Sequence, residues 1–84
     1  MARRKRNLEQ VNLATSDLTG ADLPKANLRH ATLKQTKLAQ DNLAGADLTD
    51  ADLHAATLDD ADLRDANLTR ADLRGAQLTH AKLD

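Results

Sequence analysis

The sequence predicts a solenoid in which the chain turns a corner every five residues. Leucine occupies every fifth position from Leu8 to Leu83, sixteen times without interruption. In an α-helix, a step of five residues rotates successive side chains by roughly 140°, so the leucines would spread over all faces. In a flat strand, an odd period would place successive leucines on opposite sides. A regular corner removes both problems, because every leucine then points toward one common axis.

Each leucine is the centre of a five-residue unit. Alanine fills eleven of the sixteen positions two residues before the leucine. Asp or Asn fills eleven of the sixteen positions directly before it, and the two positions after it are mainly polar and variable. The unit is therefore A-[D/N]-L-x-x. The residues that replace alanine are Arg6, Val11, Ser16, Thr36 and Asp41.

These in-register units cover essentially the whole chain and resemble the pentapeptide-repeat protein family. The resemblance implies an all-β fold, a right-handed quadrilateral parallel β-helix (solenoid) in which four units make one square coil of twenty residues. It also implies that the leucine and the small residue two before it point inward, and that the other three residues point outward. The repeat would then make about four coils, paired at about 4.8 Å as in any β-sheet.

The predicted elements follow in chain order. Residues 1–5 are expected to form a basic N-terminal tail, and residues 6–84 the pentapeptide-repeat β-helix. Leucines twenty residues apart fall into four columns, which begin at Leu8, Leu13, Leu18 and Leu23. No capping helix is expected at either end, so the terminal coils should bury their leucines less completely than the inner coils.

Three inward positions depart from the apolar pattern. Asp41 lies between Ala21 and Ala61 of its column, and burial of an ionised carboxylate without partners is costly. Two structural interpretations are open: a local bulge, or a carboxylate turned toward backbone N–H groups. Ser16 and Thr36 stack in consecutive coils, so their hydroxyls are expected to bond to each other or to nearby carbonyls.

Proline and glycine mark the corners. Pro24 directly follows Leu23, and it is expected where no backbone donor is needed. Gly20, Gly45 and Gly75 each lie two residues after a leucine, where a tight corner requires a positive φ.

Composition excludes several classes of function. The chain has no cysteine and no aromatic residue, which excludes thiolate chemistry and base-stacking platforms. His30, His54 and His80 fall on different coils and faces, so no metal site is predicted. No catalytic, cofactor-binding or metal-ligating residue and no cofactor is therefore expected, and the protein is predicted not to be an enzyme.

The same composition bears on location. No apolar run approaches the roughly 18 residues needed to cross a membrane. The basic run Arg3-Arg4-Lys5-Arg6 is followed by polar residues instead of an apolar segment, so no export signal is expected. A cytoplasmic location is predicted.

Charge and stacking give the exterior its character. Residues 1–42 carry eight Lys/Arg against four Asp/Glu, whereas residues 43–84 carry four against nine, so the stacked molecule is expected to be an electrical dipole. His30, Asp50 and Arg70 are twenty residues apart and should form a charge ladder at one corner. Asparagine side chains should also stack between coils, in the column of Asn7, Asn27, Asp47 and Asn67.

The leading functional prediction is a rigid, non-enzymatic scaffold that presents polar faces to a protein partner, since a leucine-filled interior leaves no cleft for chemistry. One alternative is implied by the family resemblance: some relatives mimic duplex DNA and bind DNA gyrase, and the acidic second half of this chain fits that idea. The other alternative is head-to-tail self-assembly through exposed coil ends, because unpaired edges invite pairing with another copy. Nucleic-acid binding is not expected.

Overall fold

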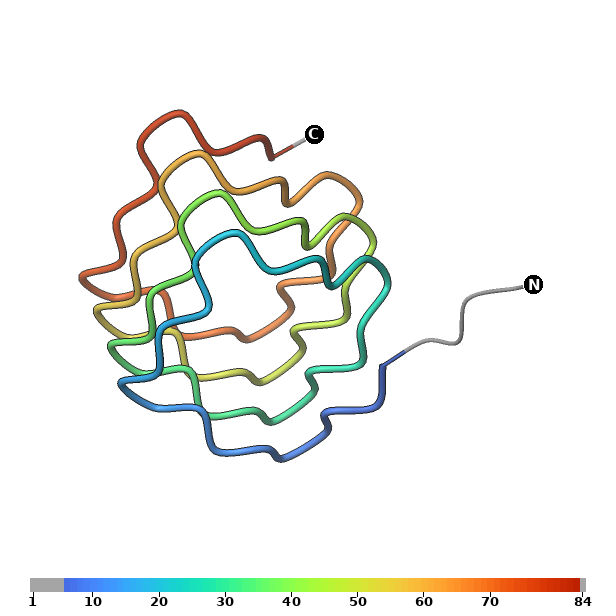
Figure 1. Ribbon diagram of the computed structural model, residues 1–84. Coiled ribbons are helices and arrows are strands. Elements are labelled where there is room, and N and C mark those ends of the chain that lie inside the picture. Colours follow the sequence, from blue (N-terminus) through green and yellow to red (C-terminus); the bar gives the residue numbers. More distant parts are fainter. Residues whose placement is uncertain (1–5, 84) are drawn as a thin grey trace.

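The computed structural model describes residues 6–83, which wind as a regular coil whose turns lie directly over one another (Figure 1). The predicted tail, residues 1–5, and the last residue, Asp84, lie outside the described residues. Between residues 6 and 83 the chain forms no helix and no strand longer than a single bridge residue. Every bridge is parallel and joins residues twenty apart, from Asn7 with Asn27 to Asp62 with Lys82. Four bridge positions in each twenty-residue turn give the coil four sides.

The backbone is hydrogen-bonded in the same way in every unit. Leu28 N–H donates to Asp47 C=O of the next coil at 2.8 Å, and His30 N–H donates to Thr49 C=O at 2.9 Å. Asn27 N–H donates to Arg6 C=O of the preceding coil at 2.7 Å. These three bonds recur at each of the four sides, so the coils hold one another as neighbouring strands of a sheet do.

A four-residue turn closes each corner. The leucine carbonyl accepts a hydrogen bond from the N–H three residues later, as from Ala21 to Leu18 at 3.0 Å. The third residue of each turn has a positive φ, as a type II turn requires. The three glycines have this conformation, as predicted, but so do twelve non-glycine residues, with φ between 55° and 64°. Pro24 occupies the second position of its turn, where type II turns favour proline. In the other described units the N–H at this position donates to no coil-to-coil backbone hydrogen bond, so proline removes none.

Glycine at such a corner should stabilise the fold. Gln35 has a φ of 58° and is exposed. A left-handed residue with a Cβ costs about 1–2 kcal/mol, more than the extra chain entropy that glycine loses on folding. Gln35→Gly is expected to raise the free energy of unfolding by about 0.5–1 kcal/mol in urea titrations. The neighbouring Lys34 has no positive φ, so Lys34→Gly is the matched control and should destabilise. Equal effects of the two variants would contradict this explanation.

The Asp or Asn before each leucine has a structural reason. Its Oδ1 accepts a hydrogen bond from the N–H two residues later, as from Arg29 to Asn27 at 3.1 Å and from His54 to Asp52 at 3.0 Å. This N–H is the one in each unit that the coil-to-coil ladder leaves unpaired, so the short side chain satisfies it locally.

The core fills the interior with leucine and alanine. All eight leucines from Leu28 to Leu63 are at most 2% exposed, and alanines at the inward positions of the same two coils are equally buried. Leucines of the first coil, residues 6–25, and of the fourth coil, residues 66–83, are only partly buried, and Leu83 is 55% exposed. The predicted inward positions are therefore confirmed, as is the weaker burial of the terminal coils.

Candidate interaction surface

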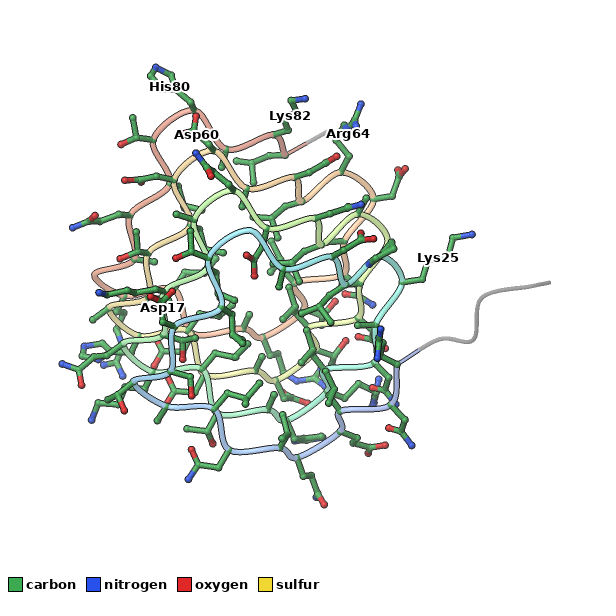
Figure 2. The ribbon with its side chains drawn as sticks, viewed as in Figure 1. Asp17, Lys25, Asp60, Arg64, His80 and Lys82 are labelled. Atoms are coloured by element: carbon green, nitrogen blue, oxygen red, sulfur yellow. The ribbon has the colours of Figure 1, made fainter. Side chains whose placement is uncertain are left out.

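The interior leaves the outward side chains as the candidate functional surface. Among residues 6–83, side chains at the position before each leucine and at the two positions after it are exposed or half-buried, except that of Thr49, and Figure 2 shows Lys25, Arg64 and His80 projecting away from the coil. In the stretch from residue 6 to residue 83, no three His, Cys, Asp or Glu side chains come together in a way that could hold a metal ion. His30, His54 and His80 lie in three different coils. The distinguishing features of the surface are therefore its charges and hydrogen bonds.

The predicted charge ladder is present at one corner. Arg70 donates from Nε and Nη2 to the two carboxylate oxygens of Asp50, at 2.8 and 3.0 Å. His30 Nε2 lies 3.6 Å from Asp50 Oδ2 on the other side. The Arg70 hydrogen bonds are the main reason why the pKa of Asp50 is lowered, and the same bonds raise the pKa of Arg70. The ladder joins the second, third and fourth coils.

The asparagine column is only partly a ladder of amides. Asn27 Nδ2 donates to Asn7 Oδ1 at 3.3 Å, as predicted. At the next coil, Asp47 accepts from Thr49 and lies 3.4 Å from Arg29 Nη1. An ion pair thus replaces the amide contact where aspartate interrupts the asparagines.

Charged residues are distributed unevenly among the coils, and a charge count over halves of the chain hides this distribution. The third coil, residues 46–65, carries seven aspartates and one arginine. The second coil, residues 26–45, carries Arg29, Lys34 and Lys37, and its one acid is the buried Asp41. The described part of the fourth coil, residues 66–83, has three basic residues and one acid. An acidic coil therefore lies between two basic ones, and ion pairs from both sides reach it.

Two acidic groups of the third and fourth coils are neutralised within their own unit. Arg64 binds both oxygens of Asp62, with its Nη2 at 2.7 Å from Oδ2, and Arg74 binds Asp72 in the same way at 2.8 Å. These side-chain hydrogen bonds lower the pKa of Asp62 and of Asp72 to about 2.

The structure decides between the two interpretations of Asp41. Its side chain is 1% exposed, and Oδ1 accepts a hydrogen bond from Ala21 N–H of the first coil at 2.9 Å. The backbone ladder continues through it without a bulge, since Asp41 N–H donates to Leu38 and its carbonyl accepts from Asp62. The carboxylate turned toward an N–H is confirmed, and the bulge is wrong. Oδ2 is buried and has no hydrogen-bond partner among the described residues.

Burial raises the pKa of Asp41 to about 6. The N–H groups of Ala21 and Gly20 act in the opposite direction, and the like charge of Asp17 adds a smaller upward shift. Thr36, in the neighbouring inward position, donates from Oγ1 to Leu13 C=O at 2.7 Å, so the predicted bond to a carbonyl is the one formed. Both buried polar side chains of the second coil therefore contact the backbone of the first.

The carboxyl groups should titrate in widely separated ranges. In a ¹³C NMR titration, Asp41 is expected to titrate near pH 6 and Asp62 and Asp72 near pH 2. Because the pKa values of Asp62 and Asp72 are lowered, their contribution to stability is present above pH 3.8 and is lost as the pH falls toward 2. Arg64→Ala should raise the pKa of Asp62 and leave that of Asp72 unchanged. A parallel shift of both groups would contradict the local pairing.

Comparison with known proteins identifies the repeat. The family model for pentapeptide repeats matches eight copies, over residues 5–35 and 46–84. The chain belongs to the pentapeptide-repeat family. Its fold is the right-handed quadrilateral β-helix of that family. No curated protein gave a significant match.

Three solved pentapeptide-repeat proteins have similar structures. A protein of the Arabidopsis thaliana thylakoid lumen is 28% identical over 93% of this chain and 58% of its own, with a TM-score of 0.82. Rfr23 of the cyanobacterium Cyanothece 51142 is 31% identical over 93% of this chain and 60% of its own, with a TM-score of 0.72. A Nostoc Pcc 7120 protein is 41% identical over 89% of this chain and 62% of its own, with a TM-score of 0.66. The pentapeptide-repeat chain described here thus spans about three fifths of the length of these proteins.

Residues 6–83 of this pentapeptide-repeat chain form the coil. Over residues 6–83, no helix is long and apolar enough to span a membrane. Within residues 6–83, the outward side chains and the edges of the coils are the surfaces open to a partner, because the inward positions are occupied by the core.

Proposed function

We propose that this chain is a non-enzymatic scaffold that binds a protein partner through its outward polar side chains. The observation that carries the proposal is that different residues of each unit build the coil and form its surface. Two residues and the backbone build the coil, and most side chains at the two corner positions after each leucine lie outside the core. The side chains of such a surface can vary in chemistry without loss of the coil structure.

The distribution of charge on the surface favours binding of a specific partner over non-specific adhesion. The acidic third coil is partly neutralised by arginines, but Asp59 and Asp65 have no ion pair to a Lys, Arg or His among residues 6–83. Electrostatic complementarity mainly sets specificity and association rate. The two successive corners that carry these residues are therefore the first to test.

The test compares sides of the coil. Asp59→Ala/Asp65→Ala and Lys34→Ala/Gln35→Ala alter outward corner positions on different sides and leave the core intact, although Asp59→Ala removes the hydrogen bond that Asp59 Oδ1 accepts from Thr79 N–H at 3.1 Å. Immobilised wild-type and variant chains, shown to melt at similar temperatures, would be used to capture binding proteins for mass spectrometry. A true partner should be lost with one pair of substitutions and retained with the other, and its affinity should then be measured with the purified partner. Capture that is unaffected by every outward substitution would contradict the proposal.

The gyrase hypothesis gains little from the structure. DNA mimicry needs a continuous negative surface, but Asp50, Asp62 and Asp72 each pair with an arginine. We therefore expect DNA supercoiling by gyrase to be unchanged by an excess of this chain. Inhibition that is lost when the third-coil aspartates are replaced would favour the alternative.

The hypothesis of head-to-tail assembly depends on unpaired coil edges and on attraction between a basic first end and an acidic last end. The acidic excess lies instead in the third coil, and the described fourth coil is basic, so charge complementarity between the ends does not support stacking. Light scattering after size exclusion, at low and high salt, tests this directly. We expect a mass that does not depend on salt.

The predicted cytoplasmic location also stays a prediction, which cell fractionation would check.

A further inference from the structure

We propose that Asp41 makes the docking of the first coil, residues 6–25, on the second coil dependent on pH. The neutral carboxyl group would hold the first coil in place, and ionisation would favour its local opening. The first coil would then respond to pH while the third and fourth coils stay closed.

The geometry places Asp41 at the contact between these two coils. Its one side-chain hydrogen bond crosses from the second coil to Ala21 N–H of the first. That N–H is shared, since it also donates to Leu18 C=O at 3.0 Å. The other carboxylate oxygen is buried without a partner in the described chain. An ionised carboxylate in this position is poorly solvated, and opening of the first coil is the shortest route by which water can reach it.

The surroundings offer the charge little compensation beyond the N–H groups of Ala21 and Gly20. Inward positions next to Asp41 in its own coil and in the third coil hold Thr36, Leu38, Leu43 and Ala61, none of which titrates. Thr36 donates its hydroxyl proton to Leu13 C=O instead of to the carboxylate. From the first coil, Asp17 is the charged residue that acts on Asp41, and its like charge also disfavours ionisation.

The first coil is also the part of this contact that can open at low cost. Leu13, Leu18 and Leu23 are only partly buried, whereas Leu33, Leu38 and Leu43 of the second coil are almost completely buried. In a solenoid each repeat contacts only its neighbours, so a terminal repeat can separate without disrupting the rest. Local openings of this kind have their own free energies, below that of global unfolding.

Linkage gives the direction and the size of the effect. The pKa of Asp41 is raised to about 6 in the closed coil, and it should return toward 3.8 when the group is hydrated. The stabilising contribution is therefore complete below pH 3.8 and is lost as the pH rises through 6. From about pH 5 to about pH 7.5, the opening equilibrium of the first coil should increase about tenfold.

Amide hydrogen exchange on the full chain tests the proposal. Leu18, Gly20 and Leu23 donate their N–H groups from the first coil to the second, whereas Leu48 and Leu53 donate from the third to the fourth. After correction for intrinsic rates, protection of the first three amides should fall about tenfold from about pH 5 to about pH 7.5. Protection of Leu48 and Leu53 should change less than about twofold.

Two variants separate titration from simple packing. In Asp41→Asn the pH dependence should disappear, and Asp41→Ala gives the same readout if the amide side chain disturbs folding. Thr36→Val removes another bond to the first coil but no titrating group, so it should lower protection by a similar factor at both pH values. The proposal would be overturned if first-coil protection did not change with pH, if the change persisted in both Asp41 variants, or if all coils changed together.

Discussion

Leu48→Ala is expected to cause a loss of stability among the largest of any core substitution in this chain. Leu48 lies in the third coil with no exposed surface, between Leu28 and Leu68 of its column. Truncation of a buried leucine to alanine costs about 2–5 kcal/mol, because the transfer free energy is lost and a cavity remains. Coils covered on both sides have little freedom to collapse, so a value of about 3–4 kcal/mol is expected. For a domain whose total stability is about 5–15 kcal/mol, this is a large fraction.

Urea unfolding followed by circular dichroism measures the change, since the chain has no aromatic residue for fluorescence. Leu83→Ala is the matched control, because Leu83 is 55% exposed and should lose less than about 1 kcal/mol. If the two substitutions had similar effects, stability would not come from the stacked leucine columns.

Asp41→Ala should stabilise the protein above pH 6 and not below pH 4. With a pKa of about 6 in the folded state and 3.8 unfolded, the carboxyl group lowers the free energy of unfolding at neutral pH by up to about 3 kcal/mol. Alanine removes this penalty and also the hydrogen bond from Ala21, which is worth about 1 kcal/mol. The net gain at about pH 7.5 is expected to be about 1–2 kcal/mol. Alanine also fits the position, because Ala21 and Ala61 occupy the same column.

Urea titrations of wild type and Asp41→Ala at about pH 4 and about pH 7.5 give the comparison. The variant should be more stable than wild type at the higher pH, and equal to it or slightly less stable at the lower pH. Asp65→Ala, on an exposed corner, serves as the control and should leave stability within about 0.5 kcal/mol at both values. A lower stability of Asp41→Ala at the higher pH would show that the carboxylate holds the coil together instead of straining it.

The two effects have opposite signs at two inward positions, the central leucine of one unit and the small-residue position of another. Leu48 removes apolar surface from water, whereas Asp41 brings a charge into the same environment with one hydrogen bond. A regular repeat makes this comparison possible, because both side chains lie in coils with the same backbone geometry.

The candidate surface was less accessible to sequence reasoning than the core was. The ladder of His30, Asp50 and Arg70 follows from the twenty-residue spacing, and the structure contains it. The acidic third coil was missed, because counting charge over halves of the chain averages it with the basic coils on each side. Pairing of Arg64 with Asp62 and of Arg74 with Asp72 depends on side-chain directions at a corner, which spacing alone does not give.

By itself, the sequence determined which residues build the coil. An uninterrupted five-residue period assigns the inward leucines and alanines, and the resemblance to pentapeptide repeats adds the four sides and the stacking of residues twenty apart. These assignments hold because one local rule is repeated in every unit, so no long-range information is needed to make them.

The tertiary structure decided the features that depend on neighbouring coils. Positive φ at non-glycine corners such as Gln35 and Lys25 is not visible in residue type, since the interlocked coils impose it against local preference. The direction of the Asp41 carboxylate depends on an N–H group twenty residues away, and its burial depends on coils above and below. Such features arise from stacking, where the free energy of the whole ladder outweighs the preference of a single residue.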